Sequence, residues 1–165
     1  MAKGDVRIYK NPYNSLPTIT VKVDDRTTTS DTAIYAGEPV KIYGAEGGNY
    51  ATHLATAEPI IGTDIVLGIT ASDSTETSTV NGEVEVYLPL PGVIYACKAT
   101  TPANLEEGIL LDTVTFDLSG TTYTVDEDEG TDENVHGLRI LGYDSDTEEV
   151  FFTFKDGVTM FGNLV

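Results

Sequence analysis

The chain has 165 residues, of which 40% are hydrophobic, and its formal net charge is −18. A chain of this length fits a single domain that buries its core without disulfides or metals, and its lone Cys97 excludes an intrachain disulfide. Because a strongly negative protein repels phosphates and anionic lipids, the charge disfavours nucleic-acid and membrane partners.

Residues 1–17 are predicted to form an extended arm that packs poorly on the rest of the chain, since prolines at positions 12 and 17 remove backbone donors and favour extended backbone. Within residues 1–26, five basic residues outnumber three acidic ones, so this segment is positive on an otherwise acidic chain. An ordinary frayed terminus is the alternative. The candidate binding residues of the arm are Lys3, Arg7, Tyr9, Lys10, Tyr13 and Leu16.

Residues 18–109 carry short strand patterns separated by turn residues. In 18–23, apolar and polar side chains alternate with a period of two, which is typical of a strand with one buried face. Further strands are predicted at 33–35, 39–43, 65–69, 83–88 and 93–99. The best helical signal is short and covers 101–108, with Thr101 as a cap, Pro102 at the first helical position and Gly108 past the end.

Residues 110–165 are predicted to form a β-meander. Strands are expected at 113–118, 123–125, 138–143, 150–155 and 158–161, with two-residue turns at 119–120 and 156–157. The expected fold is therefore all-β: a small β-barrel or sandwich over 18–109, with the extended N-terminal arm, one short helix and the C-terminal meander.

Few residues suit catalysis or metal binding. His53 and His136 do not form a ligand-spaced pair, and Cys97 stands alone, so zinc is not expected. No nucleophile elbow or phosphate-binding glycine loop is present. The acidic run 126–133 does not fit EF-hand spacing and is interpreted as a solvated hairpin loop, with calcium as the alternative. We expect no cofactor and no enzymatic activity.

Several motifs follow one another in a suggestive order: 36–40 (AGEPV), 66–71 (VLGITA), 81–86 (NGEVEV), 91–96 (PGVIYA) and 105–108 (LEEG). In this order the stretch resembles the small β-barrel of tailed-phage capsid decoration (cement) proteins, the lambda-type head stabilisers. The resemblance implies a trimer on three-fold positions of the expanded capsid, with an N-terminal arm that becomes ordered on the capsid surface. Residues after about 110 are additional to the family's minimal pattern.

The expected function is thus a capsid decoration protein on the outside of the virion, made in the host cytoplasm. Its expected partners are the major capsid protein and two copies of itself. No signal peptide or membrane-spanning run is visible. The alternatives are another virion subunit (tail tube, neck or head fibre) or a carbohydrate-binding adhesin, for which nine Tyr offer platforms although Trp is absent. A cupin-like or hydrolytic enzyme is a further alternative, but it would need clustered histidines.

Overall fold

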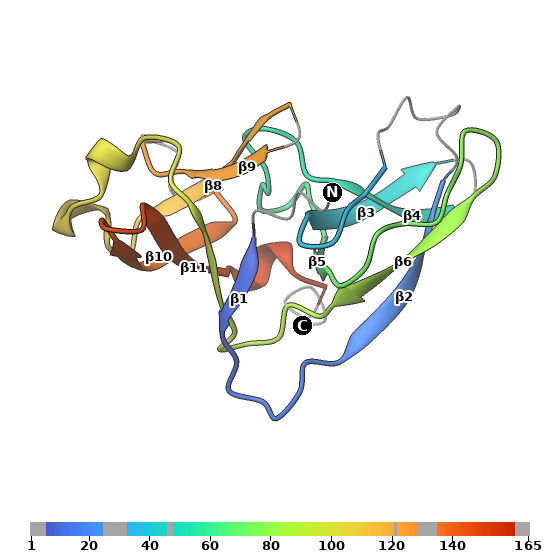
Figure 1. Cartoon of the computed structure of the whole chain (residues 1–165), viewed down its shortest axis with the longest axis horizontal. Helices are drawn as coiled ribbons and strands as arrows, with labels where there is room; N and C mark the ends of the chain where they lie inside the picture. The colour runs from blue at the N-terminus through green and yellow to red at the C-terminus, as the bar shows by residue number, and fades with distance from the viewer. Residues whose placement is uncertain (1–5, 25–32, 46–47, 121, 129–134, 161–165) are drawn as a thin grey trace.

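The computed structural model describes residues 6–24, 33–45, 48–120, 122–128 and 135–160. These residues form two antiparallel sheets and three short 3-10 turns, with no α-helix in the described part of the chain. The expectation of an all-β fold is confirmed. Of the two architectures considered, the open sheets correspond to the sandwich-like one and not to a closed barrel (Figure 1).

The six-stranded sheet, called sheet A here, occupies the left of Figure 1 and has the strand order β1-β7-β11-β10-β8-β9. It combines the start of the chain with its last third, because the edge strand β1 pairs with β7 and β7 pairs with β11. Its strands are β1 (Arg7–Lys10), β7 (Ile94–Lys98), β8 (Thr113–Ser119), β9 (Thr122–Asp126), β10 (Leu138–Asp144) and β11 (Glu149–Phe154).

The five-stranded sheet, sheet B, lies on the right of Figure 1 and has the order β2-β6-β5-β3-β4. The period-two pattern of 18–23 is realised in its edge strand β2, whose inward positions include the buried Val23. The strands of sheet B are β2 (Thr18–Val23), β3 (Pro39–Ala45), β4 (Gly48–His53), β5 (Val66–Thr70) and β6 (Gly82–Tyr87).

The two sheets are held together through β5, all five residues of which are buried. Val66 and Ile69 belong to the larger hydrophobic cluster, which sheet A covers, whereas Leu67 belongs to the smaller cluster of sheet B. A strand that is buried on both faces typically has a nearly continuous run of apolar residues, and β5 shows this pattern. Gly68 lies at the point where the pairing of β3 with β5 shifts register, and its φ is +141°.

The aromatic side chains concentrate in the larger cluster, under sheet A. Phe152 makes edge-to-face contacts with Phe116 at 5.4 Å and with Phe154 at 5.9 Å between ring centroids, and Tyr95 packs on the same group. Aromatic pairs in this geometry stabilise a core beyond the area they bury. The aromatic group therefore packs the inner face of sheet A onto the larger cluster.

The N-terminal segment differs from the expected loosely packed arm. Val6 is 2% exposed, and β1 is an edge strand of sheet A whose pairing with β7 shifts register between Ile8 and Lys10. The physical reason is that Val6 and Ile8 point inward with a period of two and join the larger cluster, while the backbone of β1 hydrogen-bonds to β7. Lys3 lies outside the described residues.

Two elements near residue 110 also differ from expectation. The predicted helix at 101–108 is replaced by two 3-10 turns, η1 (Pro102–Asn104) and η2 (Glu107–Ile109), because neither turn continues into an i to i+4 ladder. The C-terminal strands form two hairpins, but β10 pairs with β8 and not with β9, so their order is not that of a simple meander. The boundary expected at 109–110 does not separate the two sheets, since β1 and β7 lie in sheet A.

Two further details of the strand prediction are corrected. Residues 48–53 form β4, for which the sequence pattern predicted no strand, because β4 pairs along its whole length with β3. Residues 156–158 form a third 3-10 turn, η3 (Asp156–Val158), instead of a hairpin turn between two strands. Thr159 then makes a single parallel bridge to Val66.

Candidate functional site

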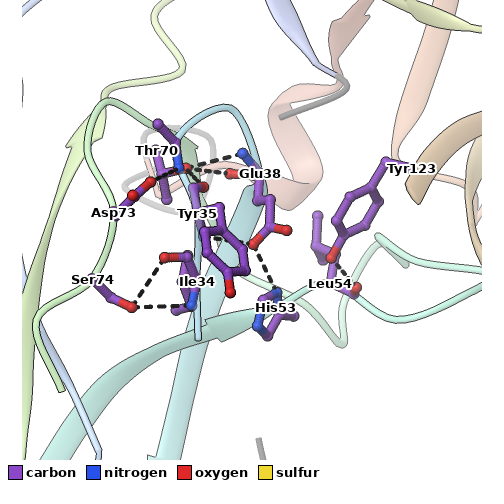
Figure 2. A network of polar contacts seen from close by, with 10 residues as sticks. Ile34, Tyr35, Glu38, His53, Leu54, Thr70, Asp73, Ser74 and Tyr123 are labelled. Carbon is purple, nitrogen blue, oxygen red and sulfur yellow. Dashed lines mark hydrogen bonds and ion pairs between the residues drawn. The ribbon is translucent and has the colours of Figure 1, made fainter. Parts of the chain in front are cut away.

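A network of hydrogen bonds fixes the segment before β3 against the segment after β5, as Figure 2 shows. The Ser74 hydroxyl donates to the Ile34 carbonyl and accepts from the Ile34 amide, both at 3.0 Å. The Thr70 hydroxyl donates to the Tyr35 carbonyl at 2.5 Å. These hydrogen bonds all lie within the chain and hold residues 34–35 in place beside the end of β5, so we assign them a structural role.

Glu38 and His53 form the most buried contact between two ionisable side chains in this network (Figure 2). The Glu38 side chain is 2% exposed, and its Oε2 lies 3.4 Å from His53 Nδ1. The same oxygen accepts a hydrogen bond from the Tyr35 amide at 2.8 Å. Because the chain itself supplies these donors to an enclosed carboxylate, we assign the pair a structural role.

A second ion cluster joins Lys41 of β3 to Glu58 and Asp64. Lys41 Nζ donates to Glu58 Oε1 and, at 2.8 Å, to Asp64 Oδ1, while Asp64 Oδ2 accepts from the Ile60 amide at 2.8 Å. Burial lowers the pKa of Lys41, but its hydrogen bonds to Asp64 and Glu58 outweigh this, so the pKa is raised overall. The lysine therefore stays charged and pins the 55–64 loop to sheet B.

The remaining residues considered for chemistry are not gathered into a centre. His136 is buried and its Nδ1 lies 3.0 Å from the Thr113 carbonyl, and the Cys97 thiol donates to the Tyr123 carbonyl. Glu127, in the acidic run, accepts hydrogen bonds from the amides of residues 100 and 101, and residues 129–133 of that run lie outside the described part. Among the described residues, no group of three or more His, Cys, Asp or Glu could hold a metal ion.

The outer face of sheet A, which points away from the larger cluster, carries three of the six predicted binding residues. Cross-strand partners share a face of a sheet. The register places Arg7 opposite Ala96, Ala96 opposite Phe151, and Phe151 opposite Gly142, so one row of this face crosses four strands. Its neighbours Ile8, Tyr95 and Phe152 form the row on the buried side.

Tyr9 and Phe151 form the aromatic centre of this outer face. Their rings stack with centroids 4.2 Å apart and planes inclined by 21°, and Tyr9 is 52% exposed. The guanidinium of Arg7 lies 5.7 Å from the Tyr9 ring centroid, within cation–π range. Phe151 fits there because Gly142 opposite it has no side chain: a Cβ on Gly142 would lie 3.3 Å from the Phe151 ring.

Basic side chains surround the aromatic pair. The basic residues of this face are Arg7, Lys10, Lys98, Arg139 and Lys155. The other two described basic residues, Lys22 and Lys41, lie in sheet B. On a chain with a net charge of −18, most of the described cations thus gather over one face.

The charges on this face are partly paired. Arg7 Nη2 and Glu149 Oε2 are 2.7 Å apart, and this hydrogen bond lowers the pKa of Glu149. Burial, followed by the nearby charge of Arg139, lowers the pKa of Lys155. Arg139 makes no ion pair within the part of the chain that the structure describes, so its charge is available to a partner.

Only some of the binding residues predicted from the sequence lie on this face. Arg7, Tyr9 and Lys10 lie on it, at β1. Tyr13 lies in the following loop and donates its hydroxyl to the Pro91 carbonyl at 2.9 Å, while Leu16 is partly buried against the larger cluster. Leu16 thus packs on the core of its own chain, and Tyr13 and Leu16 both lie off the outer face of sheet A.

Four residues of the face were missed by sequence reasoning: Lys98, Arg139, Phe151 and Lys155. They come from three separate parts of the sequence, and no local motif joins them to the N-terminal residues. The signal for Lys98, Arg139 and Phe151 was their outward position in the strand alternation of 94–98, 138–144 and 149–154, which needs the correct strand pairing to be useful.

Together, the fold and this face define an all-β, sandwich-like protein with a cationic and aromatic surface on one sheet. Comparisons with protein-family models, with curated proteins and with solved structures found no significant match. No helix among the described residues is long and apolar enough to cross a membrane.

Proposed function

We propose that this chain is a non-enzymatic capsid decoration protein, which docks on the outer surface of an expanded phage head through the outer face of sheet A. The observation that carries the proposal is the gathering of exposed cations around the stacked Tyr9 and Phe151 on an otherwise acidic protein. In this proposal the partner is the major capsid protein, the chain assembles as a homotrimer, and neither a cofactor nor nucleic acid takes part.

Electrostatics favours an acidic protein surface as the docking partner. A cationic face on a strongly negative molecule orients the approach, because the rest of the surface is repelled by the same acidic partner. Nucleic acid would attract the same face, but the phosphates flanking the contact would meet the remaining negative surface of the chain. A folded shell that presents acidic patches at a fixed spacing avoids this conflict.

The packing of β1 changes the mechanism expected from sequence. A free arm would lose conformational entropy when it became ordered on the shell. Here Arg7 and Tyr9 are already held by Glu149 and Phe151, so less ordering remains to be done on binding. Three copies of the face on one trimer would then add avidity on a symmetric lattice.

The proposal is tested by co-sedimentation of the purified chain with expanded heads and with unexpanded procapsids of the phage that encodes it. We expect binding to expanded heads only. Lys10→Glu combined with Lys98→Glu should weaken binding to the heads at least tenfold, since both charges lie on the docking face. The matched control is Lys22→Glu, which reverses an exposed charge on sheet B and should leave binding unchanged.

Two results would overturn the proposal. The first is that the wild-type chain does not sediment with expanded heads at any ratio. The second is that Lys22→Glu weakens binding as much as the charge reversals on sheet A, because binding would then follow total charge and not this face.

A further inference from the structure

Two backbone irregularities lie on opposite sides of Ile140 in β10. On the side of β11, Leu141 is the extra residue where the register shifts between Ile140 and Gly142. On the side of β8, the Leu111 amide donates to the Ile140 carbonyl at 3.0 Å, and the Ile140 amide donates to the Asp112 carbonyl at 2.9 Å. Leu111 and Asp112 therefore both oppose Ile140, which is the arrangement of a β-bulge.

Both irregularities present an exposed leucine. Leu111 is 66% exposed and Leu141 is 41% exposed, and the adjoining Leu110 is 42% exposed. We call these three residues the leucine patch. It lies beside the 3-10 turns η1 and η2, the yellow segment at the left end of Figure 1. It continues the outer face of sheet A beyond Gly142 and Phe151.

The conformation of Leu111 makes this exposure unusual. Its φ is +72°, the left-handed region in which a side chain is strained and for which glycine is preferred at such a bulge. A strained, solvent-exposed leucine stabilises neither the backbone nor the core of its own chain. Strain of this kind is typically retained where the residue serves an interaction.

The leucine patch has basic residues on one side and acidic residues on the other. On one side lie the cations Arg139 and Lys155, which are close enough for Arg139 to lower the pKa of Lys155. On the other side is an open recess of about 370 Å³, which begins at Ile109, directly next to Leu110. The acidic residues that line this recess are Glu106, Asp112, Glu127 and Asp128.

From this arrangement we infer that the leucine patch is a contact with a second copy of this chain, in a head-to-tail orientation. The patch of one copy buries its leucines on the next, so that the cationic side of one meets the acidic side of the other. Contacts between unlike surfaces of identical chains form a closed ring when the rotation from one copy to the next is a whole fraction of a turn, as it is in a trimer. The inference deepens the homotrimer of the proposed function by placing its subunit contact, but it does not depend on the identity of the shell.

Sedimentation-velocity ultracentrifugation over a range of concentrations tests the inference. We expect the wild-type chain to self-associate, and Leu111→Gly and Leu141→Ser each to raise the dissociation constant at least tenfold. Leu111→Gly is the sharper variant, because it removes the side chain while relieving the left-handed strain. Its thermal unfolding midpoint should stay the same or rise, so loss of association cannot be ascribed to misfolding.

Val80→Ser is the matched control, since Val80 is 60% exposed but lies in the loop before β6 of sheet B. It should leave the dissociation constant unchanged. The inference is overturned if the wild-type chain is monomeric up to its solubility limit, or if both leucine variants associate as the wild type does. Co-sedimentation with heads is a separate measurement. If the leucine variants still self-associate but no longer bind heads, the patch contacts the shell and not a second copy, which also contradicts the inference.

Discussion

The rings of Tyr9 and Phe151 stack 4.2 Å apart, although 142 residues separate them in the sequence. This contact joins the edge strand at the start of the chain to β11 near its end. It lies on the outer face of sheet A, where Arg7 and Glu149 form an ion pair between the same two strands. The N-terminal segment is therefore bound to the body by its own aromatic and charged residues.

The stacking should be measurable as a coupling energy. In a double-mutant cycle, Tyr9→Ala and Phe151→Ala should show a coupling of about 0.5–1.5 kcal/mol in the free energy of unfolding. Urea denaturation of the four proteins measures it. The control cycle pairs Phe151→Ala with Tyr13→Ala, because Tyr13 is bonded to Pro91 and should not couple to Phe151. Additive effects in the first cycle would show that the rings do not interact.

The Arg7–Glu149 pair predicts a specific dependence on pH. The hydrogen bond from Arg7 lowers the pKa of Glu149 from its ordinary value of 4.5. A carboxyl with a lowered pKa in the folded state contributes stability that is present above 4.5 and is lost as pH falls through the lower folded value. Carboxyl titration by NMR should give Glu149 a pKa below 4.5 in the wild-type chain.

In the Arg7→Gln variant, the pKa of Glu149 should return toward its ordinary value. In the wild-type chain, acid should also speed hydrogen exchange of the backbone amides of β1 more than that of β6, because the Arg7–Glu149 pair holds β1 and does not contact β6. A Glu149 pKa that is the same in both proteins would mean that the ion pair does not form in solution.

Gly68 should be irreplaceable for a steric reason. A Cβ at this position would lie 1.9 Å from the Tyr87 carbonyl oxygen, which is backbone and cannot turn away. Gly68→Ala should therefore lower the free energy of unfolding by at least about 3 kcal/mol. Gly62→Ala is the control: Gly62 also has a positive φ, +81°, but a Cβ there meets nothing within 4 Å. It should cost only about 1 kcal/mol, and equal costs for the two variants would contradict the packing at β5.

Removing the hydroxyl should change the stability of the fold in opposite directions at two buried tyrosines. The Tyr95 hydroxyl is buried and has no hydrogen-bond partner among the described residues, and burial raises its pKa. The Tyr123 hydroxyl donates to the Leu54 carbonyl at 2.6 Å. Tyr95→Phe should leave stability unchanged or raise it by up to about 1 kcal/mol, whereas Tyr123→Phe should lower it by about 1–2 kcal/mol. Thermal denaturation of both variants checks the sign, and a loss of stability in Tyr95→Phe would reveal a partner for its hydroxyl.

Much of the fold follows from local pattern. The alternation in 18–23 and 113–118 predicts β2 and β8, although only β2 has one exposed face, since the first four residues of β8 are all buried. β4 could not be predicted in this way, since its residues are mostly polar and small, and its pairing with β3 decides its conformation. The same reason explains β1: a four-residue strand is stabilised by β7 and β11, which lie more than 80 residues away in sequence.

The candidate site was predictable only where its residues are neighbours in sequence. The cationic N-terminal segment drew attention to Arg7, Tyr9 and Lys10, all of which lie on the docking face. Arg139 carries no local sign of its role, because only the register of β10 places it on that face. The leucine patch could not be predicted either. Leucine rarely adopts a positive φ, so nothing in the sequence indicates the bulge that exposes Leu111.

The central claim, that the outer face of sheet A meets an acidic shell, is tested most directly by site-specific photocross-linking on phage heads. A photoreactive amino acid is introduced in place of Lys10, on that face, and separately in place of Glu83, which is exposed on β6 of sheet B. After irradiation of decorated heads, we predict a cross-link to the major capsid protein from position 10 and none from position 83. A cross-link from position 83 alone would place the docking surface on the other sheet and contradict the account.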